Sequence, residues 1–175
     1  MIGARGSVEE MRSAPAPWLR RLYAAPNAVY ARGWGRLLGH RFVQLTHTGR
    51  RSGRTYRVVL EVARYDRTTG EATVTAGYGR GSDWFRNVRA GGPTWIDFGR
   101  GPRPATHREL SQDEAISVIA DYERRARLAR PLVRRVLGSL AGFDYRGSEA
   151  DRRRLVETLP MVAFTPQDGS EQQGP

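Results

Sequence analysis

The sequence contains no cysteine, no lysine and no long apolar run among its 175 residues. Without cysteine it can form neither a disulfide nor a thiolate metal site, and it has no thiol nucleophile. No apolar stretch approaches the roughly 20 residues of a membrane-spanning helix, and the N-terminus lacks the features of a secretory signal. The chain length and a hydrophobic content of 39% predict one globular unit, which we expect in the cytoplasm.

The usual signatures of metal and nucleophilic catalysis are also missing. His40, His47 and His107 show no metal-ligand spacing, so we expect no metal site. There is no Gly-x-Ser-x-Gly motif to mark an activated serine. Any chemistry must therefore depend on something other than these groups.

Arginine is abundant and supplies all of the 29 basic side chains, against 18 acidic ones, giving a formal charge of +11. A field of this sign attracts anionic partners, and the guanidinium group can hold phosphate or carboxylate through two parallel hydrogen bonds. The basic run at 124–135 raises nucleic-acid binding as one hypothesis. No aromatic residue lies between Arg124 and Leu140, however, so this run is more typical of a solvated helix face and we expect no nucleic-acid partner.

Composition and periodicity divide the chain into four parts. We expect disorder at 1–14 and in the tail at 167–175, and a helical segment at 15–40. That segment is basic and amphipathic, so it either covers the core or, through residues 15–39, contacts a membrane surface peripherally. The remaining residues, 41–166, form the main domain, with a helical insertion at 111–158.

The main domain alternates polar and apolar residues with a period of two, which indicates strands at 41–48, 55–66, 71–78, 94–99 and 103–110. Ser82 is placed to cap a short helix that Gly91 ends, Ser111 and Glu114 are spaced as a capping box, and Pro131 interrupts the helix that follows. The apolar run at 160–166 predicts a last strand. The fold class is therefore α+β: a small barrel of about six mainly antiparallel strands with flanking helices, closed by a strand from the far end of the chain.

Two glycine-rich loops are the candidate anion sites. The stretch "THTGRRSGRTYR" is not a Walker loop, because its spacing is too short and a strand follows it. Its glycines still allow backbone N–H groups to point at an anion, and its arginines add charge. The stretch "AGYGRGSDWFRNV" turns through three glycines into a helix N-terminus. If both loops share one rim, Tyr78 and Trp84 can contact a planar ring; alternatively, Trp84 and Phe85 only anchor the helix to the core.

These stretches, with "ADYERR" and "RLVETLPMVAF", resemble the deazaflavin (F420)-dependent nitroreductase family, the split-barrel F420-dependent oxidoreductases of actinobacteria. The resemblance spans about residues 27–166. It implies a split β-barrel related to the FMN-binding barrels, with coenzyme F420 between the loops, and FMN as the alternative cofactor. The implied cofactor-binding residues are Thr48, Gly49, Arg50, Arg51, Ser52, Gly53, Arg54 and Arg57 for the phosphate and oligoglutamate tail, and Ala76, Gly77, Tyr78, Gly79, Trp84 and Asn87 around the ring.

The implied activity is hydride transfer from F420H2 to a small electron-poor acceptor, nitro or unsaturated. Tyr78 is the candidate proton donor and Tyr56 the second candidate. Many family members have proline and arginine where this chain has Thr55 and Tyr56, which puts one tail contact in doubt. A carrier that binds F420, FMN or haem without turnover is the alternative function. The sequence leaves both a monomer and a homodimer open.

Overall fold

Six strands pair antiparallel and close into a barrel in the order β1-β2-β3-β6-β5-β4. The computed structural model describes residues 39–167. The strands are β1 (Phe42–Thr48), β2 (Thr55–Tyr65), β3 (Ala72–Thr75), β4 (Thr94–Asp97), β5 (Arg103–Glu109) and β6 (Met161–Pro166). The predicted fold class, an α+β barrel of about six antiparallel strands closed from the far end of the chain, is confirmed.

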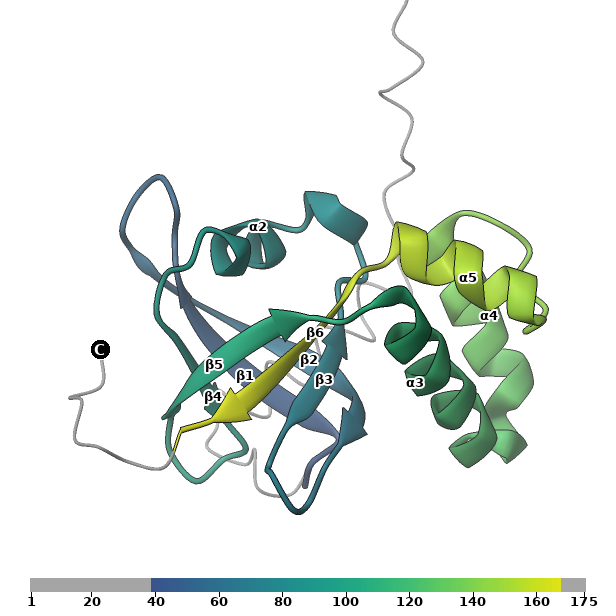
Figure 1. The fold of residues 1–175 in the computed structure, drawn as a ribbon, viewed down its shortest axis with the longest axis horizontal. Helices are drawn as coiled ribbons and strands as arrows, with labels where there is room; N and C mark the ends of the chain where they lie inside the picture. Colours follow the sequence, from purple (N-terminus) through teal and green to yellow (C-terminus); the bar gives the residue numbers. More distant parts are fainter. Residues whose placement is uncertain (1–38, 168–175) are drawn as a thin grey trace, which may run out of the picture.

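Helices cover one end and one side of the barrel (Figure 1). They are the 3-10 turn η2 (Gly79–Gly81), α2 (Asp83–Arg89), α3 (Gln112–Arg125), the 3-10 turn η3 (Arg127–Ala129), α4 (Arg130–Ala141) and α5 (Glu149–Thr158). The last four lie between β5 and β6, within the range expected for a helical insertion. None of the helices in the part of the chain that the structure describes is long and apolar enough to cross a membrane.

Several predictions concern residues outside this range. The disorder expected at 1–14 and 168–175, the helical segment at 15–38 and its membrane contact all lie outside the described residues. Of these predicted segments only Gly39 and His40, which form a turn, and Gln167 are described.

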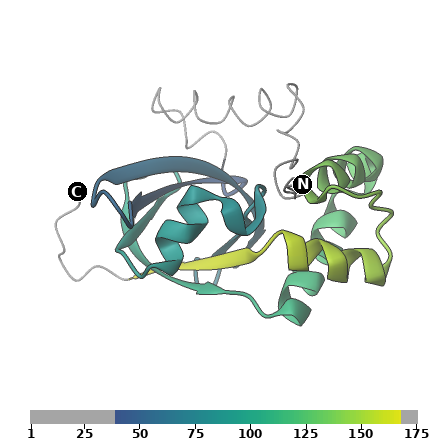
Figure 2. The ribbon, with the colours of Figure 1, turned by 90° about the horizontal axis from the view of Figure 1, so that it is seen from above.

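The first core fills the barrel, and α2 closes its upper end. Val43, Leu45 and Phe164 are fully buried inside it. From α2, the side chains of Phe85 and Val88 enter the same cluster with at most 1% of their surface exposed. In the view from above, α2 lies across the barrel while α3, α4 and α5 stand to one side (Figure 2).

The second core lies between the helices and the outer face of β6. Alternate residues of β6 point in opposite directions, so Val162 and Phe164 join the barrel core while Met161 and Ala163 join the helical core. All four are at most 2% exposed. Burial on both faces explains why this strand is a continuous apolar run rather than an alternating one.

Most of the local signals act as predicted. The Ser111 and Glu114 capping box is formed, and Gly91 follows α2 with a φ of +78°. The prediction that the Ser82 side chain caps α2 is wrong, because its hydroxyl donates to the Gly79 carbonyl oxygen at 2.9 Å and accepts no helix N–H. Pro131 lies in the first turn of α4, where its missing N–H costs nothing, while α3 has already ended at Arg125.

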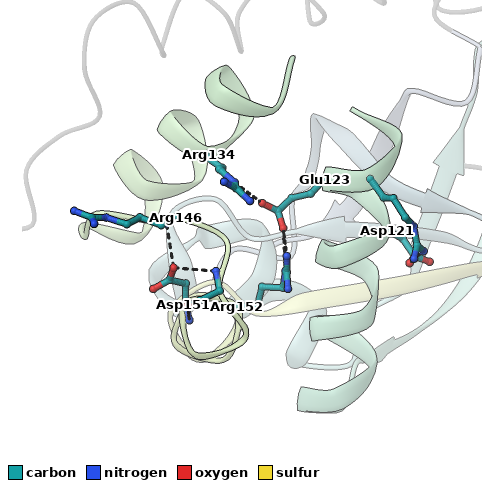
Figure 3. A network of polar contacts seen from close by, with 8 residues as sticks. Asp121, Glu123, Arg134, Arg146, Asp151 and Arg152 are labelled. Atoms are coloured by element: carbon teal, nitrogen blue, oxygen red, sulfur yellow. Dashed lines mark hydrogen bonds and ion pairs between the residues drawn. The ribbon is translucent and has the colours of Figure 1, made fainter. Parts of the chain in front are cut away.

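A buried carboxylate joins the three helices of the second core (Figure 3). Glu123 on α3 is 3% exposed; its Oε1 accepts from Arg134 Nε at 3.1 Å, and its Oε2 accepts from Arg152 Nη2 at 2.7 Å. Burial and the neighbouring charge of Glu123 raise the pKa of the Tyr145 hydroxyl above its usual range. The packing of α3, α4 and α5 against one another thus depends on the ion pairs of one carboxylate, that of Glu123, with two arginines.

We expect Glu123→Ala to lower the free energy of unfolding by about 3 kcal/mol, because it leaves two partly buried guanidinium groups without their counter-charge. Urea unfolding measures the loss. The control is Asp144→Ala, which removes an ion pair whose side chains are 82% and 75% exposed and should cost less than about 1 kcal/mol. Equal losses for the two variants would contradict the role of the buried network.

Candidate functional site

Both glycine loops leave the same end of the barrel. The register pairs Thr48 with Thr55, His47 with Thr94, and Thr75 with Met161. The C-terminal ends of β1 and β3 therefore meet the N-terminal ends of β2, β4 and β6. We call this end the rim; it carries loop 49–54, residues 76–82 and α2, at the top of Figure 1.

The first loop is a tight turn that needs both of its glycines. Gly49 N donates to Arg54 O, and Gly53 N donates to Gly49 O, each at 2.8 Å. Gly53 has a φ of +64°, which other residues rarely adopt. A Cβ on Gly49 would lie 2.6 Å from Tyr56 Cε2 and 2.7 Å from Ser52 Oγ. The loop shape therefore follows directly from the Gly-x-x-x-Gly spacing.

Asn87 on α2 holds this loop in place. Its Oδ1 accepts from Arg50 N at 3.1 Å and from Arg50 Nη1 at 2.8 Å. Arg50 Nη1 also lies 3.4 Å from Asp83 Oδ1. The Arg50 guanidinium is thus engaged within the protein, and it positions the loop rather than extending from it.

The other end of the Asn87 amide meets His47. Asn87 Nδ2 lies 3.3 Å from His47 Nδ1, and because the amide oxygen already accepts from Arg50, its NH2 group is the donor here. His47 is 5% exposed, and burial lowers the pKa of its imidazole, opposed by a hydrogen bond with the Thr48 backbone and by the charge of Asp83. Burial thus favours the neutral imidazole, and in that form the hydrogen bond that Nδ1 accepts from Asn87 places the proton on Nε2.

The other arginines of the loop and its flank are exposed to solvent. Arg51, Arg54 and Arg57 are exposed and form no ion pair with another described residue. Beside them the Ser52 and Tyr56 hydroxyls lie 3.1 Å apart, and Ser52 Oγ also accepts from Arg54 N at 3.3 Å. Arg51 and Arg54 belong to the loop, whereas Arg57 lies within β2. Guanidinium and hydroxyl groups are donors suited to a polyanion.

The second loop is a buried turn with one exposed aromatic residue. Ala76 and Gly79 are buried, Ala76 N donates to Pro160 O at 2.9 Å, and Gly79 N donates to Ala76 O at 2.7 Å. Gly77 lies against Leu140 of α4. Tyr78 is 56% exposed and extends from the rim. It is the exposed aromatic residue of this loop.

Trp84 belongs to the barrel core. It is 8% exposed, and its ring packs edge-on against Phe85 at 5.9 Å and tilted against Phe164 at 6.4 Å. Both aromatic residues of α2 therefore anchor the helix. Of the predicted site residues, the rim brings the first loop, Asn87 and Tyr78 to one end of the barrel but holds the Trp84 ring inside.

Sequence reasoning missed His47 and Asp83 as parts of this site. Within β1, His47 continues the row of Val43 and Leu45, which face the barrel interior. The period-two pattern could therefore have placed His47 at the inner edge of the rim. Among the residues that the structure describes, no group of three or more histidine or acidic side chains is arranged to hold a metal ion.

Comparisons with known proteins find no matching family model and no matching curated protein. Among solved structures, an F420-H2-dependent reductase, FDR-A, is 21% identical with a TM-score of 0.45, over 71% of this chain and 93% of that one. A protein described as a domain-swapped dimer is 20% identical with a TM-score of 0.47, over 84% and 96%. A pyridoxamine 5'-phosphate oxidase-related, FMN-binding protein from Nostoc punctiforme is 16% identical with a TM-score of 0.43, over 86% and 81%. These likenesses are distant, and the function proposed below does not rest on them.

Proposed function

We propose that the rim binds coenzyme F420 and that the protein is an F420H2-dependent oxidoreductase acting on a small electron-poor acceptor, nitro or unsaturated. The observation that carries this proposal is the donor set of the first loop. Arg51 and Arg54 belong to a turn whose shape is fixed by glycine and by Asn87, Arg57 follows in β2, and the exposed Tyr78 lies at the same barrel end.

The donor set fits the cofactor that the sequence resemblance implies. F420 carries a phosphodiester and several glutamates, and the exposed arginines with the Ser52 hydroxyl would hold this tail. Arg50 and Asn87 would keep the loop in its binding shape, and residues 76–79 would lie beside the ring. When bound, the deazaflavin supplies the hydride.

The protein's own tasks are then to orient the acceptor and to deliver a proton. Two exposed hydroxyls at the rim can do the second. Tyr78 extends from the second loop, whereas the Tyr56 hydroxyl is already in contact with Ser52 Oγ. Tyr78 is therefore the first candidate for the donor and Tyr56 the second.

Titration of F420 fluorescence tests cofactor binding. We expect the wild type to bind F420 in preference to FMN, which carries one phosphate and fewer charges. The double variant Arg51→Glu, Ser52→Ala should bind F420 at least about tenfold more weakly, since it reverses one charge and removes one hydroxyl.

The matched control is Arg67→Glu, Thr68→Ala, which makes the same changes in the turn between β2 and β3 at the opposite barrel end. Its F420 affinity should stay within about twofold of the wild type, because exposed charges a barrel length away are screened. Equal losses for the two double variants, or a preference for FMN, would refute the assignment of the tail site.

A screen of nitro and unsaturated acceptors with F420H2 tests turnover and distinguishes an enzyme from a carrier. We expect Tyr78→Phe to lower kcat by about a hundredfold while the Kd for F420 stays unchanged, because the variant removes only the proton donor. Tyr56→Phe is the comparison. Unchanged kcat for Tyr78→Phe rules out its donor role, and loss in Tyr56→Phe would transfer that role to Tyr56.

The neutral His47 predicts how the stability of the rim depends on pH. Since the pKa of His47 is lower in the folded chain than in the unfolded one, its contribution is complete above about pH 6.5 and is lost as the pH falls through the folded value. His47→Gln keeps an acceptor for Asn87 without titrating. Urea unfolding at pH 7.5 and 5.5 should therefore show a smaller loss on acidification for this variant, and an identical loss would contradict the prediction.

A further inference from the structure

A second arginine-rich feature lies away from the rim, in the helical layer. A depression of about 650 Å³ is lined by residues of α4 and of the segment 143–146, which crosses this helix. The crossing is close because residue 138 is glycine: a Cβ there would lie 2.8 Å from Phe143 O. The volume is in the range of small-molecule sites, about 300–1,000 Å³.

The side chains around the depression are strongly basic. Arg130, Arg134 and Arg135 come from α4, with Arg130 and Arg134 one turn apart, and Arg146 comes from the crossing segment. Ser139 adds a hydroxyl one turn beyond Arg135. The one acidic residue in the lining is Asp144. More widely, residues 124–143 include six arginines and no aspartate or glutamate.

Two of the four guanidinium groups already have a carboxylate. Arg134 donates to Glu123, and Arg146 holds Asp144 Oδ2 through Nε at 2.9 Å and Nη2 at 2.8 Å. In Figure 3, Arg134 is directed at Glu123. Arg130 and Arg135 form no ion pair with another described residue, and Arg130 Nε is buried without a hydrogen-bond partner. Arg130 and Arg135 are therefore the two guanidinium groups of the depression whose charge no described carboxylate neutralises.

We infer that this depression is a second binding site, for a phosphate-bearing anion held by Arg130 and Arg135. The guanidinium groups of Arg130 and Arg135 each offer a donor fork, and these forks match the oxygens of one or two phosphate groups. The inference concerns a different face from the rim and does not depend on the proposed oxidoreductase function.

The phosphate can come from a soluble ester or from the headgroup of an anionic phospholipid. The neighbouring surface makes both sources relevant, because Leu128 is 94% and Leu132 is 57% exposed beside the arginines. Exposed leucines flanked by arginines are the composition that binds at a lipid interface. The experiment therefore has a soluble arm and a vesicle arm.

The soluble arm is calorimetric titration with pyrophosphate at low salt, in the full-length Arg51→Glu, Ser52→Ala background so that the rim loop contributes little. We expect saturable binding with one site per chain. Adding Arg130→Gln and Arg135→Gln should weaken it at least tenfold. The control adds Arg67→Gln and Arg127→Gln, which remove two exposed arginines outside the depression that form no ion pair with another described residue, and should change the Kd less than twofold.

Far-UV circular dichroism checks that each variant is folded, and the single variant Arg135→Gln, whose side chain is exposed, provides a second test with at least threefold weaker binding expected. Absence of saturable binding overturns the inference, as does an equal loss in the control variant. Failure of F420 to bind the wild type would leave this result untouched, so the two proposals fail separately.

The vesicle arm is co-sedimentation with phosphatidylglycerol vesicles, compared with phosphatidylcholine alone. If the source is a headgroup, the protein sediments with the anionic vesicles, Leu128→Ser, Leu132→Ser abolishes sedimentation, and this variant still binds pyrophosphate. If the source is soluble, pyrophosphate binds and the vesicles do not sediment the protein. Sedimentation that survives Arg130→Gln, Arg135→Gln means that the depression does not hold the headgroup.

Discussion

The pairing of β6 with both β3 and β5 is the constraint on which the rest of the structure depends. It joins residues near 160 to strands that end near 75 and 109, and it turns an open sheet into a barrel. Because β6 is buried on both faces, it is part of the barrel core and of the helical core at once. The register that it completes also decides which loops meet at the rim, so closure of the barrel assembles the candidate site.

At the rim, the side-chain amide of Asn87 connects separate elements, as β6 does in the barrel. Asn87 connects β1 through His47, the first loop through Arg50, and α2 to which it belongs. These contacts engage the guanidinium group of Arg50 within the protein, whereas the other arginines of the loop, Arg51 and Arg54, stay exposed. A loop that is fixed before a ligand arrives loses less conformational entropy on binding.

The sequence predicts the barrel well because local patterns encode it. Period-two alternation locates the strands, and the apolar run from Met161 to Phe164 is readable as a strand buried on both faces. The side-chain contacts were out of reach for a physical reason: Asn87 and His47 are 40 positions apart and meet only through barrel geometry. The Ser82 prediction failed because the hydroxyl is directed at the Gly79 carbonyl oxygen, to which it donates, and accepts from no helix N–H.

Net charge was the least informative property of this sequence, because a guanidinium group can serve two opposite purposes. Arg134 and Arg152 neutralise the buried Glu123 and contribute to folding, whereas Arg51 and Arg130 have no carboxylate among the described residues. A paired arginine adds little to the field that a ligand meets, since its partner cancels it at short range. Recognition of an anion therefore depends on which guanidinium groups remain unpaired and on whether glycine lets the backbone hold them together, as at Gly49 and at Gly138.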